Sequence, residues 1–281
     1  MDLDDVVRLG LLLSIWLIVF SLGARSSAAT AVFLVRRPAD LLRALTAMFV
    51  AVPAFAILLA ATVPLAPPIK FAIVAMSVAP TAPIVPYKQV KAGADADYAL
   101  GLMVAAALGS ILLTPVLVAL ATYLLGAQAA VSMGAVTRPL LISIGLPLAA
   151  GMLLRAVAKP VAQAVCGLAQ RVGSLVLLVV FAIMVAAAWR QILGLFGNGG
   201  VAAIAATIAV GLLAGHLLGG RRYRVALALA AATRHPGVAF AIAEMSYPEE
   251  RKPIMAALLL FLLASLLVTA PYVRWARGRG G

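Results

Sequence analysis

Long runs of apolar residues, separated by short polar linkers, follow one another along the whole chain. Most runs are close to the roughly 20 residues with which an α-helix crosses about 30 Å of hydrocarbon. Such segments must be helical because lipid supplies no partners for backbone N–H and C=O groups. The pattern therefore predicts an all-α polytopic membrane protein with nine transmembrane helices. The predicted spans are Leu9–Ala24, Leu41–Val63, Ile69–Val90, Tyr98–Leu125, Leu140–Leu154, Val172–Ala188, Val201–Leu218, Val225–Met245 and Ile254–Val273.

The composition supports this prediction and excludes other classes of protein. Hydrophobic residues make up 65% of the 281-residue chain and charged residues 11%, whereas soluble domains average about 45–50% and about 25%. A soluble enzyme, a coiled coil and a disordered chain are thereby excluded. An outer-membrane barrel is excluded as well, because its strands alternate apolar with polar residues. We expect residues 1–281 to form a single integral membrane domain.

The charge pattern predicts how the chain lies in the membrane. The net charge of +13 comes mainly from residues that sit singly between apolar runs, which does not indicate a nucleic-acid partner. With nine spans, fifteen lysines and arginines fall on one side of the membrane and six on the other. Because cytoplasmic loops carry the excess of positive charge, we expect the N-terminus outside and the C-terminus in the cytoplasm. Abundant alanine, and arginine in excess of lysine, favour a bacterial inner membrane.

Two of the predicted spans contain helix-breaking residues. Pro80, Pro83 and Pro86 follow one another at intervals of three in the third span. Each proline lacks an N–H and clashes with the carbonyl four residues earlier, so Pro83 frees the carbonyl of Ala79. The stretch Thr233–Gly237, with its proline and glycine, interrupts the eighth span. Freed backbone at membrane depth is tolerated where it is buried in protein or lines a cavity.

The positions of these breaks predict an internal repeat. They lie five spans apart, so the two broken segments cross the membrane in opposite directions. The chain then forms an inverted repeat of four plus four helices with two broken, crossing helices. We place the first repeat at 6–126, a linking helix at 138–158 and the second repeat at 171–275. Such repeats are typical of secondary transporters, whose site lies where the broken helices meet.

Four stretches of the chain resemble motifs of the bile acid/sodium symporter family. Arg37–Arg43 is similar to that family's Pro-x-Asp/Glu…Arg stretch, and Ala79–Pro86 falls at its Cys-Pro-Gly-Gly-Thr-Ala-Ser-Asn crossing point. Ser110–Pro115 is similar to Ser-Pro-Leu-Leu-Thr-Pro, and Thr233–Gly237 falls at Met-Gln-Asn-Ser-Gly. The resemblance implies a nine-span form of the family fold. Spans one, five and six would form a panel, and the other six a core that holds both broken helices.

The chain departs from this family at the positions that hold sodium. The resemblance places Ala230 at a sodium-binding glutamate, Arg234 at a glutamine and Pro86 at an asparagine. Other polar positions of the family are filled by Val85, Met103, Ala99 and Met48. A hard cation needs several oxygen ligands. We therefore expect no cofactor, no bound metal, and sodium coupling that is absent or altered.

Arg234 is the residue on which the predicted chemistry depends. A charge at mid-membrane is costly and is expected to face the interior with a partner, and a guanidinium binds carboxylate, sulfate or phosphate through two bonds. We hypothesise that Arg234 supplies covalently the positive charge that sodium supplies in the family. Two structural alternatives stay open. One is an ion pair with Glu244, Asp95 or Asp97, and the other is hydrogen bonding to the freed carbonyls of the third span.

The predicted substrate site surrounds the point where the two breaks meet. His235 is a candidate for proton uptake, and Gln89 is a candidate to reach the cavity from the cytoplasmic side. The predicted substrate-binding residues are Arg234, Thr233, His235, Pro236, Gly237, Pro80, Thr81, Pro83, Pro86 and Gln89.

The function predicted from these features is secondary transport of a small organic anion across the lipid bilayer by alternating access. A passive facilitator or a proton-coupled carrier of small organic acids is the alternative. An intramembrane enzyme is more remote, because HExxH, GxSxG and paired carboxylates within a span are all missing. We therefore predict no enzymatic activity, and the oligomeric state stays open.

Overall fold

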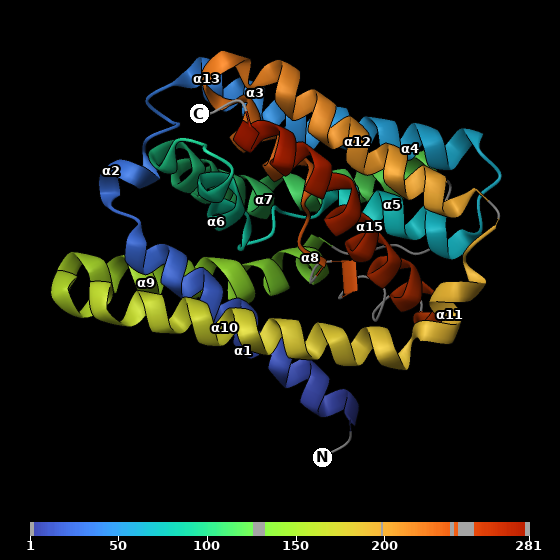
Figure 1. Cartoon of the computed structure of the whole chain (residues 1–281), viewed down its shortest axis with the longest axis horizontal. Coiled ribbons are helices and arrows are strands. Elements are labelled where there is room, and N and C mark those ends of the chain that lie inside the picture. The colour runs from blue at the N-terminus through green and yellow to red at the C-terminus, as the bar shows by residue number, and fades with distance from the viewer. Residues whose placement is uncertain (1–2, 126–132, 198, 237–238, 241–249, 279–281) are drawn as a thin grey trace.

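The computed structural model describes residues 3–125, 133–197, 199–236, 239–240 and 250–278, and these fold into helices joined by short linkers (Figure 1). Six helical segments are long and apolar enough to cross a membrane. They are Asp5–Arg25, Pro38–Thr62, Ala96–Leu124, Lys159–Ala187, Gly200–Leu218 and Arg251–Gly278. This confirms an all-helical, multi-pass membrane architecture. The described parts of the other three predicted spans include the shorter helices α5 (Pro67–Val78) and α6 (Val85–Lys91), α9 (Leu146–Val157), and α13 (Gly220–Ala232).

Three helices, α1, α9 and α10, pack against one another and form the lower layer of Figure 1. Their bounds are Leu3–Arg25 for α1, Leu146–Val157 for α9 and Lys159–Ala187 for α10. α8 (Met133–Leu140) and the π-helix η2 (Leu141–Gly145) lead into α9, and α11 (Trp189–Gly194) follows α10. A Cβ atom on Gly151 would lie 2.2 Å from the carbonyl oxygen of Phe20, so α9 packs backbone to backbone on α1. These three helices are the ones for which the family resemblance implies a panel.

The remaining helices form a second group, in which α12 packs against α13, α15 and α4, and α5 packs against α15 and α4. In its first half the bounds are α2 Ala28–Ala31, α3 Pro38–Leu45, η1 Thr46–Ala51, α4 Val52–Thr62, α5 Pro67–Val78, α6 Val85–Lys91 and α7 Ala96–Leu124. In its second half they are α12 Gly200–Leu218, α13 Gly220–Ala232 and α15 Arg251–Gly278. This group contains both of the predicted helix breaks.

Each of the two π-helices precedes a proline. η1 ends two residues before Pro53, and η2 ends two residues before Pro147. Because proline has no N–H, the α-helical ladder cannot be completed at these points, and a wider turn accommodates the defect. In the i→i+5 pattern of η1, the donor for the carbonyl of Met48 would come from Pro53. That carbonyl is therefore available to another donor.

Glycines allow α12 to approach α13 very closely. A Cβ atom on Gly215 would lie 2.4 Å from the Cα of Ala228, and one on Gly211 would lie 2.8 Å from the carbonyl oxygen of Ala231. Small residues spaced by four are typical of such close contacts between membrane helices. The contact holds the last turns of α13, which ends at the second break, close against α12.

Candidate transport site at the helix breaks

The predicted interruptions of spans three and eight lie together in the structure. Residues 79–84 stand outside any helix between α5 and α6, which confirms the break predicted from the prolines. α13 ends directly before Thr233, which adopts an extended conformation with φ −110° and ψ 105°. Thr81 and Arg234 then form an isolated antiparallel β-bridge. The two broken segments thus meet through backbone groups that have no partner within their own helices.

Two hydrogen bonds join the backbones at this bridge. The N–H of Ala82 donates to the carbonyl of Thr233 at 3.2 Å, and the N–H of His235 donates to the carbonyl of Pro80 at 2.7 Å. Backbone groups freed by the helix breaks therefore satisfy one another without water. The pairing also brings together predicted site residues that lie about 150 positions apart in the chain.

The guanidinium of Arg234 lies inside this crossing, with 1% of the residue exposed. Its Nε donates to the carbonyl of Ala231 at 3.0 Å, one terminal nitrogen to Ala79 at 3.2 Å and the other to Met48 at 2.6 Å. The three acceptors belong to α13, to the break after α5 and to η1. One side chain thus joins three elements that are remote in sequence.

Each of these three carbonyls lacks its helical donor for an identifiable reason. The donor for Ala79 would be Pro83, which has no N–H. The donor for Met48 in the π-helical pattern would be Pro53. The donor for Ala231 would be the N–H of His235, which already donates to Pro80. The guanidinium therefore satisfies three acceptors that would otherwise be buried and unpaired, a condition that costs about 1–3 kcal/mol for each.

Three hydroxyl groups satisfy further carbonyls at the breaks. Thr114 donates to Val78 at 2.9 Å, Thr81 to Ala230 at 3.2 Å and Ser265 to Ala232 at 3.5 Å. In a continuous helix the donors for these carbonyls would come from Ala82, Arg234 and Pro236, whose backbones are diverted or, for proline, have no N–H. The freed backbone oxygens around the crossing thus accept hydrogen bonds from the protein itself.

The structure places the predicted site residues in two groups. Pro80, Thr81, Thr233, Arg234 and His235 meet at the crossing.

The second group consists of Pro86 and Gln89, which lie on α6 beyond the crossing. Gln89 is 1% exposed, and its Nε2 donates to the carbonyl of Ala226 at 2.6 Å, so the side chain is held against α13. Pro83 and Pro86 are buried, Pro236 is half-buried, and Gly237 lies outside the described residues.

Of the partners considered for Arg234, Asp95 pairs with another arginine, whereas a carbonyl of the third span accepts from the Arg234 guanidinium. Asp95 pairs with Arg222 at 3.3 Å and caps α7 by accepting from the N–H of Tyr98. Glu244 lies outside the described residues. The contacts that the structure gives Arg234 are hydrogen bonds to backbone carbonyls, including that of Ala79 in the third span.

Sequence reasoning missed the carbonyl of Met48 and the hydroxyls of Thr114 and Ser265. The position of Pro53, five residues after Met48, is the sequence signal for the first of these. Thr114 and Ser265 lie in uninterrupted helices, where nothing in the local sequence marks them as donors to a break.

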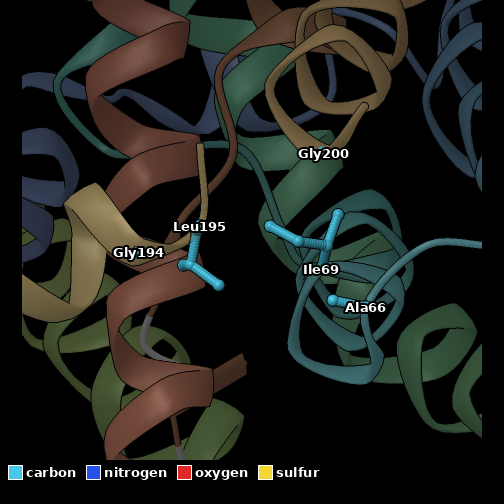
Figure 2. A pocket seen from close by; sticks show the side chains of 5 residues that line it. All are labelled: Ala66, Ile69, Gly194, Leu195 and Gly200. Carbon is cyan, nitrogen blue, oxygen red and sulfur yellow. The ribbon is translucent and has the colours of Figure 1, made fainter. Parts of the chain in front are cut away.

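A small hollow lies away from the crossing, at the opposite end of α5 (Figure 2). Its lining consists of Ala66, Ile69, Gly194, Leu195 and Gly200. None of these side chains carries a charge or a hydrogen-bonding group, so none of them can pair with an anion.

Comparison with known families places this architecture. The family model described as Sodium Bile acid symporter family matches residues 12–197. The matched region includes η1 and the first helix break and ends before the segment that carries Arg234. No curated protein matches the chain. With about two thirds of its length matched, the chain belongs to the sodium bile acid symporter family.

Proposed function

We propose that the protein is a secondary transporter that moves an organic anion by alternating access, with Arg234 as a fixed cation in place of bound sodium. Family membership supports transport rather than enzymatic activity. The observation that carries the proposal is the guanidinium of Arg234 inside the crossing, surrounded by backbone carbonyls. The substrate class proposed is an amphipathic or small organic acid.

The oxygen atoms at the crossing argue against a sodium ion there. A sodium ion needs several oxygen ligands, and the freed carbonyls already accept hydrogen bonds from Arg234, from hydroxyls or from backbone N–H groups. The family resemblance also implies that Ala230 stands where sodium-coupled members have a glutamate. The residues present therefore do not fit a sodium ion, and a tethered cation supplies the positive charge instead.

The same guanidinium retains donors for an anion. Of the five N–H donors of an arginine, three serve the carbonyls of Ala231, Ala79 and Met48. The other two, one on each terminal nitrogen, are the donors that we propose for a carboxylate or sulfonate. An anion that reached these donors would meet a guanidinium that three backbone carbonyls already hold in position.

The topology proposed for this transporter is the nine-span inverted repeat. The short helices α5 with α6, η2 with α9, and α13 would supply the three spans beyond the six long ones. In this topology α5 and α13 run in opposite directions, which agrees with the antiparallel bridge between their ends. The charge asymmetry supports an orientation with the N-terminus outside and the C-terminus in the cytoplasm, which we propose here.

Uptake into liposomes that contain the purified chain tests the proposal. A labelled bile acid and a labelled small 2-oxo acid serve as probes, with sodium or potassium as the only alkali cation. We expect uptake by the wild type to be the same in both salts. Arg234→Gln should lower uptake by roughly 10- to 100-fold, the equivalent of one charge-assisted hydrogen-bonded contact. Arg190→Gln, at an exposed arginine of α11, is the matched control and should leave uptake unchanged.

Two results would contradict the proposal. One is wild-type uptake of either probe that requires sodium. The other is unchanged uptake in Arg234→Gln. Equilibration of the probe without accumulation under any ion gradient would instead identify a passive facilitator, and accumulation driven by a proton gradient would identify a proton-coupled carrier.

A further inference from the structure

A second arginine, Arg37, is held in a defined position at the edge of the membrane-spanning region. It lies in the linker between two candidate membrane spans, Asp5–Arg25 and Pro38–Thr62. Its guanidinium carbon lies 4.2 Å from the centre of the Phe33 ring, and a terminal nitrogen donates to the hydroxyl of Tyr223. A side chain with contacts of both kinds is oriented before any ligand arrives.

The two aromatic residues that orient Arg37 are themselves fixed. Tyr223 stacks on Tyr98, with ring centres 3.9 Å apart and planes within 6°. Phe33 meets Tyr98 edge to face at 6.4 Å and packs against Gly101 of α7, where a Cβ atom would lie 3.0 Å from it. The guanidinium of Arg37 therefore lies over Phe33 of its own linker, and Phe33 and Tyr223 both pack on Tyr98 at the start of α7.

Arg37 has neutral partners, although carboxylates lie nearby. Within the part of the chain that the structure describes, Asp40 pairs with Arg43 and Asp95 pairs with Arg222, each at 3.3 Å. No ion pair with Arg37 is present there. A half-buried, positioned guanidinium without a carboxylate has unused donors that match phosphate or carboxylate oxygens.

The residues close to Arg37 in the chain combine positive charge with exposed apolar side chains. Arg36 is exposed beside it, while Val35 and Leu42 are 64% and 66% exposed. These residues flank the boundary of a predicted span, where lipid headgroups and the first acyl carbons lie. An acyl chain would cover the apolar side chains, and a headgroup phosphate would face the guanidinium.

We propose that Arg37, with Arg36, Val35 and Leu42, forms a binding site for an anionic phospholipid headgroup. The shared chemistry is a phosphate oxygen on a planar guanidinium, and the exposed apolar flank favours a lipid over a free phosphate ion. This lipid site is separate from the crossing, so the result of its test does not depend on the proposed transport function.

Native mass spectrometry of the purified full chain tests this proposal. The protein in detergent is titrated with phosphatidylglycerol and, separately, with phosphatidylcholine, and bound lipid is counted. One basic residue near an anionic headgroup strengthens binding by about fivefold. We expect phosphatidylglycerol to bind more tightly than phosphatidylcholine, and Arg37→Gln to weaken phosphatidylglycerol binding about fivefold. Arg190→Gln, an exposed arginine without an aromatic platform, should leave it unchanged.

A second variant covers the case in which Arg37→Gln fails to fold. Tyr223→Phe keeps the cation and the stacked ring but removes the hydroxyl that orients Arg37, so phosphatidylglycerol binding should weaken about twofold or more. Unchanged lipid binding in the folded Arg37→Gln variant, or in Tyr223→Phe where the first does not fold, would overturn the proposal. Displacement of phosphatidylglycerol by millimolar inorganic phosphate would also overturn it, because the site would then be one for free phosphate.

Discussion

Replacing Arg234 by alanine removes one guanidinium and leaves the carbonyls of Met48, Ala79 and Ala231 without that donor. Hydrogen bonds between membrane helices contribute about 0.6–1.7 kcal/mol each, so three of them correspond to about 2–5 kcal/mol. Removal of a buried charge acts in the opposite direction, because that charge no longer has to be desolvated. We therefore expect Arg234→Ala to lower the free energy of unfolding by about 2–3 kcal/mol, the lower part of this range.

Equilibrium unfolding in mixed micelles, followed by far-ultraviolet circular dichroism, measures this loss. Two further variants separate charge from hydrogen bonding. Arg234→Lys keeps the charge, but its compact ammonium cannot match the three directions of a planar guanidinium. Arg234→Gln removes the charge and keeps one amide donor group. We expect the lysine variant to be intermediate and the glutamine variant to be close to alanine, with Arg190→Ala as the control for a surface arginine.

Chemical rescue provides the sharpest form of this test. Free guanidinium at millimolar concentration, well below the range in which it denatures proteins, should raise the unfolding temperature of Arg234→Ala and leave that of the wild type unchanged. A ligand that binds only the folded state stabilises it in proportion to the logarithm of its concentration. An alanine variant within about 0.5 kcal/mol of the wild type, with no response to guanidinium, would refute the role assigned to these three bonds.

Two further predictions concern packing and pH. Gly215→Ala should lower the free energy of unfolding by about 1–3 kcal/mol, because the added Cβ would lie 2.4 Å from the Cα of Ala228. The control is Gly194→Ala, whose Cβ would meet nothing within 4 Å among the described residues and which should leave the thermal unfolding temperature nearly unchanged. The N–H of Tyr98, which donates to the carboxylate, is the main cause that holds the pKa of Asp95 below its ordinary value, with a smaller contribution from Arg222. The stabilisation by this cap is therefore present above about pH 4 and lost as the pH falls through the lowered pKa. The difference in unfolding temperature between wild type and Asp95→Ala should accordingly shrink in acid; a difference independent of pH would contradict the assignment.

The breaks could be predicted from the sequence because proline acts locally. The missing N–H of Pro83 interrupts a helix whatever surrounds it, and the structure leaves residues 79–84 outside any helix. The same rule identified the carbonyl of Ala79 as a partner available to Arg234. A charge beside a break, with freed carbonyls nearby, has few other acceptors at this depth.

The rest of the site depends on packing between elements that are far apart in the sequence. Local sequence patterns do not predict which of these elements meet. The carbonyl of Met48 lies 186 residues before Arg234. Thr114, which donates to the carbonyl of Val78, lies 36 residues after Val78. Which residues meet is decided by the register of helices, and that register follows from close contacts such as the one between Gly215 and α13. Gln89 is a further example, because its Nε2 donates to the carbonyl of Ala226, 137 residues away, and the local sequence does not indicate this partner.

The proposed replacement of sodium by Arg234 has a consequence for the direction of transport. Arg234 stays with the protein and returns with the empty carrier, so the net charge moved in each cycle is that of the substrate alone. Moving one negative charge into a compartment at −100 mV costs about 2.3 kcal/mol, which corresponds to a roughly 50-fold lower internal concentration at equilibrium. Without sodium to offset this cost, the transporter should export a monovalent anion from a cell with a negative interior. In liposomes clamped by potassium and valinomycin, reversing the potential should reverse net flux of the labelled anion, and protein-free liposomes should show neither flux. Flux that is insensitive to potential would mean that a cation enters with the anion, and substitution of His235 would be the first test for a proton in that role.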